Sequence, residues 1–296
     1  MIRKIGQYRN GNYNVKIYED GTKIRETEGD EFLAEFPESM DVKITNKCDM
    51  GCPMCHENSV VDGKHGDILS PKFLDTLRPF TEIAIGGGNP LEHPDLLKFL
   101  AKLRDKRIIA NMTVNQVHFE NNFDYIKLLC DMGYLKAVSV SVTSITEEFI
   151  SKVKILNNVV IHTIVGITTP ETFEILKDKD LKVLILGYKI FRRGSEYIMS
   201  QDNGERVSEN QYWLMQNLKD LIPHFKIVSF DNLALEQLYV KNIMTKEKWD
   251  EFYMGDDGKH TMYIDLVEEM YARSSVSTKR YPLKDDICDI FADILA

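Results

Sequence analysis

Apolar residues recur along this chain with two alternating periodicities. Between residues 40 and 188, short apolar or alternating runs are separated by segments in which apolar residues recur every three or four positions. The short runs predict strands, and the segments between them predict amphipathic helices. The predicted strands are residues 40–45, 82–85, 108–114, 137–142, 159–167 and 181–188, and the predicted helices are residues 71–80, 94–106, 123–132, 146–153, 170–176 and 208–221.

Six strands that alternate with helices predict a parallel sheet with the helices packed outside it. Local signals agree with several boundaries: Ser70 and Pro71 favour a helix start, and Gly133 favours a helix end. The periodicity by itself does not distinguish a curved partial barrel from an open doubly wound sheet.

The residues before the first of these strands alternate differently. Residues 13–28 alternate between apolar and polar around Asp20-Gly21, which predicts a β-hairpin with a tight turn. Residues 1–39 are too few to bury a core of their own, so we expect them to form an edge or lid ribbon.

The pattern changes again after about residue 226. Residues 226–230 are a candidate seventh strand, and residues 253–265 predict a second hairpin that turns at Asp257-Gly258. The expected organisation is therefore a hairpin ribbon over residues 1–39, a core over residues 40–225 and a small α+β extension over residues 226–296.

Composition and charge narrow the class of protein. The chain has 296 residues, enough for one large α/β domain, and no apolar run approaches the roughly 18 residues of a membrane helix. Its start, Met1 to Gln7, lacks the apolar stretch of a signal peptide, so we expect a cytoplasmic protein. The net charge of −9 weighs against a nucleic-acid substrate, although a local basic patch is compatible with it.

Three of the five cysteines, Cys48, Cys52 and Cys55, directly follow the first predicted strand of the core. Thiolates packed this densely select zinc, copper(I) or an iron–sulfur cluster. A cubane cluster normally takes four ligands, so three cysteines would leave one iron open. The alternative is a structural zinc site with His56 as the fourth ligand. Cys130 and Cys288 lie in apolar, helix-like segments and are interpreted as buried small side chains.

The C-x3-C-x2-C spacing, followed after the second strand by Gly87-Gly88-Asn89-Pro90, resembles the radical S-adenosylmethionine (radical SAM) enzyme family over roughly residues 40 to 230. The resemblance implies a (β/α)6 partial TIM-type barrel whose site lies at the carboxyl ends of the strands. It also implies that the three cysteines hold a 4Fe-4S cluster and that SAM binds its fourth iron. A one-electron reductant such as flavodoxin or ferredoxin would drive formation of a 5′-deoxyadenosyl radical, which takes hydrogen from a peptide or small-molecule substrate.

The resemblance further implies which residues contact SAM. These are Met54, Gly87, Gly88, Asn89, Asn115, Ser139, Ser141 and Gly187. Glycine permits a close backbone approach to SAM. Asn89 departs from the family, which usually has glutamate here, and the two serine hydroxyls could instead bond only to neighbouring backbone. The extension has no cysteine besides Cys288, so no second cluster is expected.

Two other functions stay open at this level. They are radical-based modification of nucleic acid and a zinc-stabilised binding protein without catalysis. Arg192 and Arg193 could bind a carboxylate, although a solvated turn is the simpler interpretation, and His118 is interpreted as a surface histidine. No residue identifies the substrate or a catalytic group.

Overall fold

A ten-stranded sheet organises the computed structural model, which describes residues 2–296. In spatial order its strands are β10 (Ile227–Phe230), β9 (Lys182–Leu186), β8 (Val159–Ile164), β7 (Ala137–Ser141), β6 (Ile109–Asn115), β5 (Glu82–Gly87), β4 (Ser39–Thr45), β11 (Thr261–Asp265), β12 (Met270–Ala272) and β13 (Tyr281–Pro282). All neighbours from β10 to β11 pair in parallel, and β12 and β13 are antiparallel.

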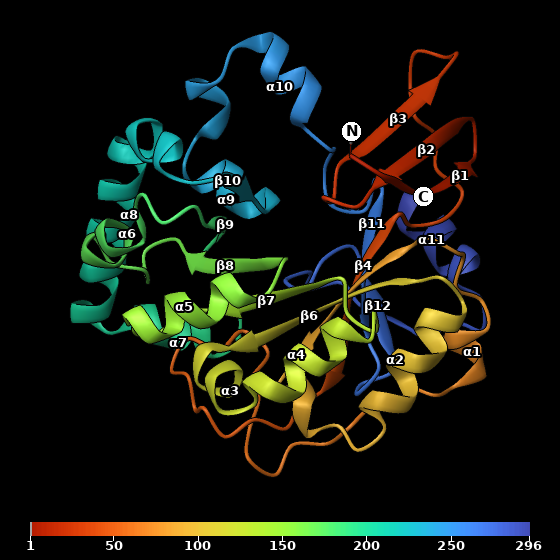
Figure 1. Cartoon of the computed structure of the whole chain (residues 1–296), viewed down its shortest axis with the longest axis horizontal. Coiled ribbons are helices and arrows are strands. Elements are labelled where there is room, and N and C mark those ends of the chain that lie inside the picture. Colours follow the sequence, from red (N-terminus) through yellow and green to blue (C-terminus); the bar gives the residue numbers. More distant parts are fainter. Residues whose placement is uncertain (1) are drawn as a thin grey trace.

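Helices surround this curved sheet; most lie along its outer face, and the one formed by residues 246–252 projects away from it (Figure 1). They are α1 (Pro71–Leu74), α2 (Leu96–Asp105), α3 (Gln116–Asn121), α4 (Phe123–Asp131), α5 (Glu147–Ile155), α6 (Pro170–Leu176), α7 (Arg193–Met199), α8 (Gln201–Leu221), α9 (Asn232–Gln237), α10 (Lys246–Phe252) and α11 (Ile287–Leu295), with 3-10 turns η1 (Pro90–Glu92), η2 (Ile222–His224) and η3 (Val240–Ile243). The alternation of β4 to β9 with helices confirms the predicted (β/α)6 partial barrel. None of the helices in residues 2–296 is both long and apolar enough to cross a membrane.

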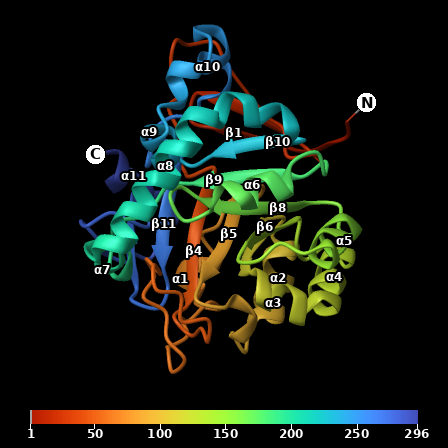
Figure 2. The same ribbon diagram turned by 90° about the vertical axis from the view of Figure 1, so that its left-hand side faces the viewer.

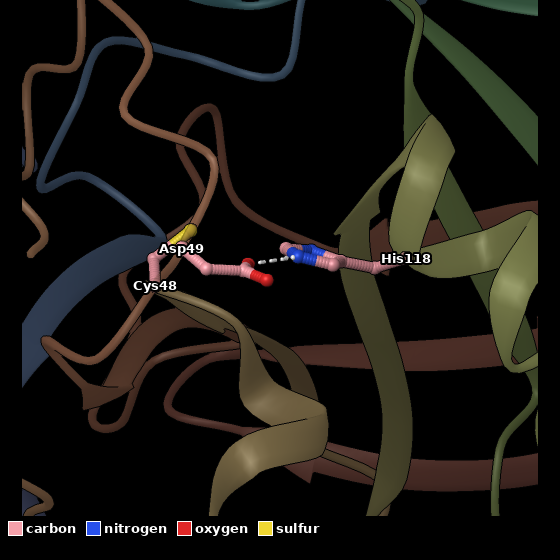
Figure 3. Close-up of side chains that lie close together, drawn as sticks. All are labelled: Cys48, Asp49 and His118. Carbon is pink, nitrogen blue, oxygen red and sulfur yellow. Dashed lines mark hydrogen bonds and ion pairs between the residues drawn. The ribbon is translucent and has the colours of Figure 1, made fainter. Parts of the chain in front are cut away.

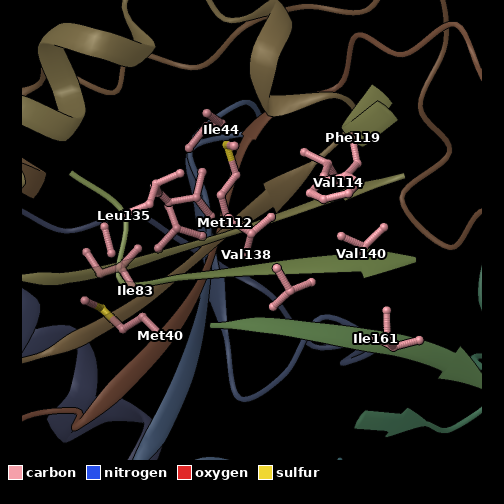
Figure 4. Packing of buried hydrophobic residues seen from close by; sticks show 14 of the residues in the cluster. Met40, Ile44, Ile83, Met112, Val114, Phe119, Leu135, Val138, Val140 and Ile161 are labelled. Carbon is pink, nitrogen blue, oxygen red and sulfur yellow. The ribbon is translucent and has the colours of Figure 1, made fainter. Parts of the chain in front are cut away.

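The two faces of the sheet differ in burial. Val138, Val140 and Ile161 point outward, are fully buried and pack in the core beneath the helices (Figure 4). Along β5, β7 and β9 every inward residue is partly exposed, whereas the alternate outward residues are buried. A closed TIM barrel fills its interior with branched apolar side chains. Here the inner positions of β5 and β7 carry mostly small or polar residues, whereas β8 and β9 also place partly exposed apolar residues there, among them Ile164 and Leu184.

Two predicted helices differ from the structure in length. The helix predicted over residues 71–80 ends at Leu74, and the Thr76 hydroxyl donates to the carbonyls of Lys72 and Phe73 instead of leaving them to the helix. The helix predicted to start at Ser208 begins at Gln201, capped by the Ser200 hydroxyl, which accepts from Asn203 N–H at 3.3 Å.

The N-terminal ribbon is a separate three-stranded antiparallel sheet of β1 (Lys4–Asn10), β2 (Tyr13–Tyr18) and β3 (Lys23–Thr27). The hairpin predicted over residues 13–28 is confirmed, but β1 adds a strand that its pattern did not suggest. The ribbon lies at the amino-terminal ends of the barrel strands, opposite the loop that follows β4 (Figure 2). It therefore does not cover the carboxyl end of the barrel.

The C-terminal residues complete the main sheet. The predicted seventh strand is β10, but the hairpin predicted over residues 253–265 is wrong: the hairpin consists of β11 and β12. β11 also pairs in parallel with β4, Tyr263 beside Asp41 and Asp265 beside Lys43. This long-range pairing brings the inward side chains of β11 next to the start of the cysteine loop.

Candidate metal centre and active site

The loop after β4 carries the three clustered cysteines at the carboxyl end of the barrel. Cys48, Cys52 and Cys55 are half-buried and free. Backbone bonds shape the loop, from Cys48 N–H to the carbonyl of Val60 at 2.8 Å and from Cys55 N–H to the carbonyl of Cys52 at 3.2 Å. Burial raises the pKa of the Cys48 and Cys52 thiols. Metal binding would deprotonate these thiols, and three soft donors on one short loop fit an iron–sulfur cluster with one open iron.

The arrangement does not fit the zinc alternative. A tetrahedral zinc site with 2.3 Å bonds would bring its sulfur atoms within roughly 4 Å of one another. Among residues 2–296 the ligand atoms that gather within 4.8 Å are those of Cys48, Asp49 and His118, and not the three sulfur atoms. His56 Nε2 lies 3.3 Å from both a Glu57 oxygen and the Lys189 ammonium. His56 therefore contacts Glu57 and Lys189 and is not placed to complete a zinc site with the cysteines.

Asp49, inside the cysteine motif, binds a histidine on α3, the helix that directly follows β6. His118 Nε2 lies 2.6 Å from Asp49 Oδ1, and Figure 3 shows the two side chains pointing toward each other. His118 is only 5% exposed, so its interpretation as a surface histidine was wrong. The hydrogen bond from His118 lowers the pKa of Asp49. This contact joins the first half of the loop to α3.

Glu57, two residues after Cys55, joins the second half of the loop to the barrel. Its carboxylate lies 3.2 Å from the Lys43 ammonium and accepts from the Tyr263 hydroxyl at 3.2 Å. Lys43 also lies 3.3 Å from Asp265. Although burial would raise the pKa of Glu57, the hydrogen bond from His56 and the nearby positive charges hold it well below its usual range. The C-terminal strand β11 therefore supports the cysteine loop directly.

Arginines from the start of α7 hold the same half of the loop. Arg192 Nη1 donates to the Glu57 carbonyl at 2.8 Å, and Arg193 Nη2 donates to the Ser59 carbonyl at 2.7 Å. The interpretation of these arginines as a solvated turn was wrong. Both bind backbone carbonyls of the loop, and Arg192 Nη1 also lies 3.9 Å from the Glu57 carboxylate.

Comparison with known proteins decides the family. Residues 42–188, which include the cysteine loop and the glycine segment, match the model of the Radical SAM superfamily. The chain is a radical SAM enzyme. Members of this family use a 4Fe-4S cluster and SAM, and these are its cofactors.

Two curated relatives of this radical SAM enzyme come from Methanocaldococcus jannaschii. It is 28% identical over 122 residues to a probable GTP 3′,8-cyclase, and 26% identical over 119 residues to a 7,8-dihydro-6-hydroxymethylpterin dimethyltransferase. The matches cover 39% and 36% of this chain, and they span only 39% and 22% of the relatives' own lengths.

Solved structures of Streptococcus suis SuiB share the fold. SuiB bound to its precursor peptide SuiA aligns with a TM-score of 0.57 at 14% identity, over 88% of this enzyme and 65% of SuiB. SuiB bound to S-adenosylmethionine aligns with a TM-score of 0.53 at 13% identity, over 84% and 64%. At this identity the likeness concerns the fold, and the enzyme spans less than two thirds of SuiB.

The glycine segment of the radical SAM enzyme packs against the start of the cysteine loop. A Cβ on Gly87 would lie 2.4 Å from the Thr45 carbonyl oxygen, and one on Gly88 would lie 2.2 Å from that of Lys47. Gly87 also has φ +112°. These two glycines are thus needed for the close approach of β5 to the loop. Gly86, which the sequence analysis did not name, has nothing within 4 Å of such a Cβ and leaves the inner wall open.

The two asparagines expected to contact SAM each cap a turn at the carboxyl end of a strand. Asn89 Oδ1 accepts from Leu91 N–H at 3.2 Å, and Asn115 Oδ1 accepts from Val117 N–H at 2.9 Å. In each side chain the amide NH2 group is the donor that this capping bond leaves for a ligand.

The other residues expected at the cofactor lie at different depths. Ser139 and Ser141 are partly exposed on the inner face, beside Thr113 and Asn115 of β6. Met54 is partly exposed within the cysteine loop. Gly187 is covered on one side, because a Cβ there would lie 2.5 Å from Leu233, and its N–H donates to Asp231. Contact of any of these residues with SAM stays a prediction.

Sequence reasoning missed several polar residues of the inner face. His162 on β8 pairs in register with Ser141, is 7% exposed, and has no hydrogen-bond partner for either ring nitrogen within residues 2–296. Burial, with the nearby Lys189 charge, lowers its pKa to about 4. One feature of the sequence could have drawn attention to Lys43, namely a charged residue inside an apolar strand. No feature of the sequence marked Glu57 or Tyr263, because the residues that they contact are remote in the sequence.

Proposed function

We propose that Cys48, Cys52 and Cys55 ligate the 4Fe-4S cluster of this radical SAM enzyme, which acts on a peptide or a small polar molecule held inside the barrel. The observation that carries the ligand assignment is the position of three half-buried thiols on one loop at the carboxyl end of β4. Together with SAM, the bound cluster supplies one-electron cleavage that yields a radical able to take hydrogen from the substrate.

The chain's own residues position the reactants. Asp49 with His118, and Glu57 with Lys43 and Tyr263, fix the two halves of the cysteine loop. Asn89 and Asn115 present amide donors, and Ser139 and Ser141 present hydroxyls, toward the space in which we place SAM. Electrons would come from a flavodoxin or a ferredoxin.

The polar residues on the inner face of the barrel favour a polar substrate. Asn111 and Thr113 are partly exposed on this face and Asp41 is exposed, while His162, which has no hydrogen-bond partner among the described residues, is buried on the same wall. A neutral imidazole offers one donor and one acceptor to a substrate amide or hydroxyl. The Lys189 ammonium, which bonds to His56 and to the Ser275 hydroxyl, is a second candidate contact for an anionic group.

Anaerobic reconstitution of wild type, Cys52→Ala and Cys130→Ala tests the proposal. Wild type and Cys130→Ala should each take up about four iron per chain and release 5′-deoxyadenosine when SAM and dithionite are added. Cys52→Ala should do neither. Full iron loading of Cys52→Ala would contradict the ligand assignment, and loaded wild type that forms no 5′-deoxyadenosine would contradict the chemistry.

A further inference from the structure

Two cavities follow strand β1 where the ribbon meets the amino-terminal end of the barrel. The larger has a volume of about 710 Å³ and is lined by Gln7, Tyr8 and Arg9 on the ribbon side and by Pro79 and Phe80 on the barrel side. The smaller, about 400 Å³, begins at Arg3 and Ile5. Arg107 lines both cavities, and the two neighbouring cavities are together named the β1 groove here.

The β1 groove is basic although the chain is acidic. Its walls hold six basic side chains and two acidic ones, Glu19 and Glu35, in a chain with a net charge of −9. The basic residues are Arg3, Arg9, Arg78, Arg104, Arg107 and Lys136. Arg3 pairs with Glu19, and Arg104 pairs with Asp105. The other four have no carboxylate oxygen within 4.0 Å in residues 2–296, which leaves their charges for an external anion.

One wall of the groove is the edge of a sheet. β1 is an outer strand of the ribbon, paired with β2 on one side only. An edge strand presents unpaired backbone groups to a further strand. A seven-residue strand is about 20 Å long, which suits an extended chain better than a compact ligand. A bulge between Lys4 and Gly6 separates the two cavities, so Gly6 to Asn10 is the regular part of the edge.

Aromatic residues complete the larger cavity. Phe36 and Phe80 line it, and the Tyr8 hydroxyl is buried without a hydrogen-bond partner in the described residues. Phe80 packs against Gly6, where a Cβ would lie 2.5 Å from its ring. Arg9 Nε donates to the Gly11 carbonyl at 3.0 Å, and Arg78 Nη2 lies 3.6 Å from Cys288 Sγ, so neither guanidinium group is paired with a carboxylate. Apolar walls beside such guanidinium groups suit a segment that alternates apolar and acidic residues.

We propose that the β1 groove binds an extended acidic peptide segment, which adds a strand to β1 while its carboxylates contact Arg9, Arg78 and Arg107. The groove lies at the opposite end of the barrel from the cysteine loop (Figure 2). The bound segment is therefore a recognition segment, separate from the residue that reacts. This inference rests on the proposed function only in taking a peptide as the substrate, because binding in the groove needs neither cluster nor SAM.

Fluorescence anisotropy with a labelled (Glu-Val)4 peptide tests the proposal on the full-length reconstituted enzyme. The peptide should bind, a (Lys-Val)4 peptide should not, and added salt should weaken the complex. Arg9→Gln with Arg78→Gln should weaken binding at least about tenfold, since two charge-assisted contacts are lost. Arg206→Gln on α8, which removes a charge outside the groove, should bind as wild type does.

Two further probes separate strand addition from simple charge attraction. A (Glu-Val)4 peptide N-methylated on alternate residues should bind at least about tenfold more weakly in one of its two methylation registers, because N-methylation removes backbone donors. A single-stranded oligonucleotide should not compete. Equal binding of both methylated peptides, equal binding of the double variant, absence of peptide binding, or preference for the oligonucleotide would each overturn the proposal.

The double variant should keep wild-type iron content and peptide-independent release of 5′-deoxyadenosine. Loss of 5′-deoxyadenosine from wild type would contradict the proposed function while leaving the binding result intact. Loss of peptide binding alone would contradict only the groove assignment.

Discussion

Two buried glutamates lie at opposite ends of the barrel with closely similar partners. Glu38, just before β4, lies 3.2 Å from the Lys23 ammonium and 2.8 Å from Arg25 Nε, and accepts from the Tyr13 hydroxyl at 2.6 Å. Glu57, in the cysteine loop, has a lysine, a tyrosine and a histidine within 3.3 Å. Strand β11 connects the two sites, because His260 before it lies 3.7 Å from Glu38 and Tyr263 within it binds Glu57.

The difference lies in what each glutamate holds in place. The partners of Glu38 come from the ribbon and from His260, so this site fastens β2 and β3 to the barrel. The partners of Glu57 come from β4, β11 and the start of α7, so that site fastens the loop that carries the cysteines. A buried charge is costly when it loses its partner. The buried ion pairs of Glu38 therefore stabilise the fold. Those of Glu57 stabilise the fold and also hold the cysteine loop, and with it the three thiols, in position.

Lys43→Met should produce the largest effect. It leaves Glu57 and Asp265 buried without their shared ammonium, and breaking such a pair costs about 3–5 kcal/mol. Urea unfolding should show this loss, and the reconstituted variant should release iron to a chelator faster than wild type. The matched change at the other end, Lys23→Met, should cost less, because Arg25 Nε still pairs with Glu38 at 2.8 Å, whereas the arginine left beside Asp265, Arg280, lies 3.6 Å away. It should leave iron release unchanged. Equal iron release from both variants would contradict the division of roles.

Acid should weaken the fold through two buried histidines. Burial, with the Arg25 charge, lowers the pKa of His260 to about 4, and burial with the Lys189 charge does the same for His162. Histidine in the unfolded chain has a pKa of about 6.5. The unfolded state therefore binds these protons more readily, so this stability is complete above about pH 6.5 and is lost as pH falls toward 4. Each histidine contributes up to about 3 kcal/mol.

Urea unfolding of wild type, His260→Gln and His162→Leu between pH 4 and 7 measures this contribution. Each variant should show a shallower dependence of unfolding free energy on pH than wild type. Parallel curves for wild type and both variants would show that other groups cause the acid sensitivity.

Tyrosine to phenylalanine substitutions compare the Glu38 and Glu57 sites with smaller changes than the lysine substitutions. Tyr13→Phe and Tyr263→Phe each remove one hydroxyl donor to a buried carboxylate, worth about 1.5–3 kcal/mol. Both should lower the urea midpoint by similar amounts. Only Tyr263→Phe should alter the electron-resonance spectrum of the reduced cluster or its iron retention. A changed spectrum in Tyr13→Phe would mean that the two sites are coupled through β11.

Asn89→Asp should have the smallest effect. Aspartate keeps the cap on Leu91 N–H and adds the negative charge that the family's glutamate provides. If this side chain meets the SAM ammonium, affinity for SAM should be preserved or rise by about 1 kcal/mol, since a charge-assisted hydrogen bond is the stronger one. Calorimetric titration of SAM into anaerobic enzyme measures this. Weaker SAM binding with unchanged iron content would place the side chain away from the ammonium.

The strands and helices of the core followed from local residue patterns. The alternation of valine with small residues over 137–142 predicts a strand wherever the segment lies, because alternate residues of a strand point to the same face. Pro71 and Gly133 act on the backbone of their own segment. The cysteine spacing is equally local, which is why the metal centre could be predicted before any fold was known.

Only tertiary structure decided which distant residues meet. The pairing of β11 with β4 joins strands that are more than two hundred residues apart along the chain, and no local pattern records a partner strand. Glu57 and Lys43, Asp49 and His118, and the β1 groove all arise where separate elements come together. The sequence predicted that Gly87 and Gly88 permit a close backbone approach to SAM. Only the fold showed that they also lie against the backbone of Thr45 and Lys47. A side chain's type is fixed by sequence, whereas its burial and partners depend on long-range packing.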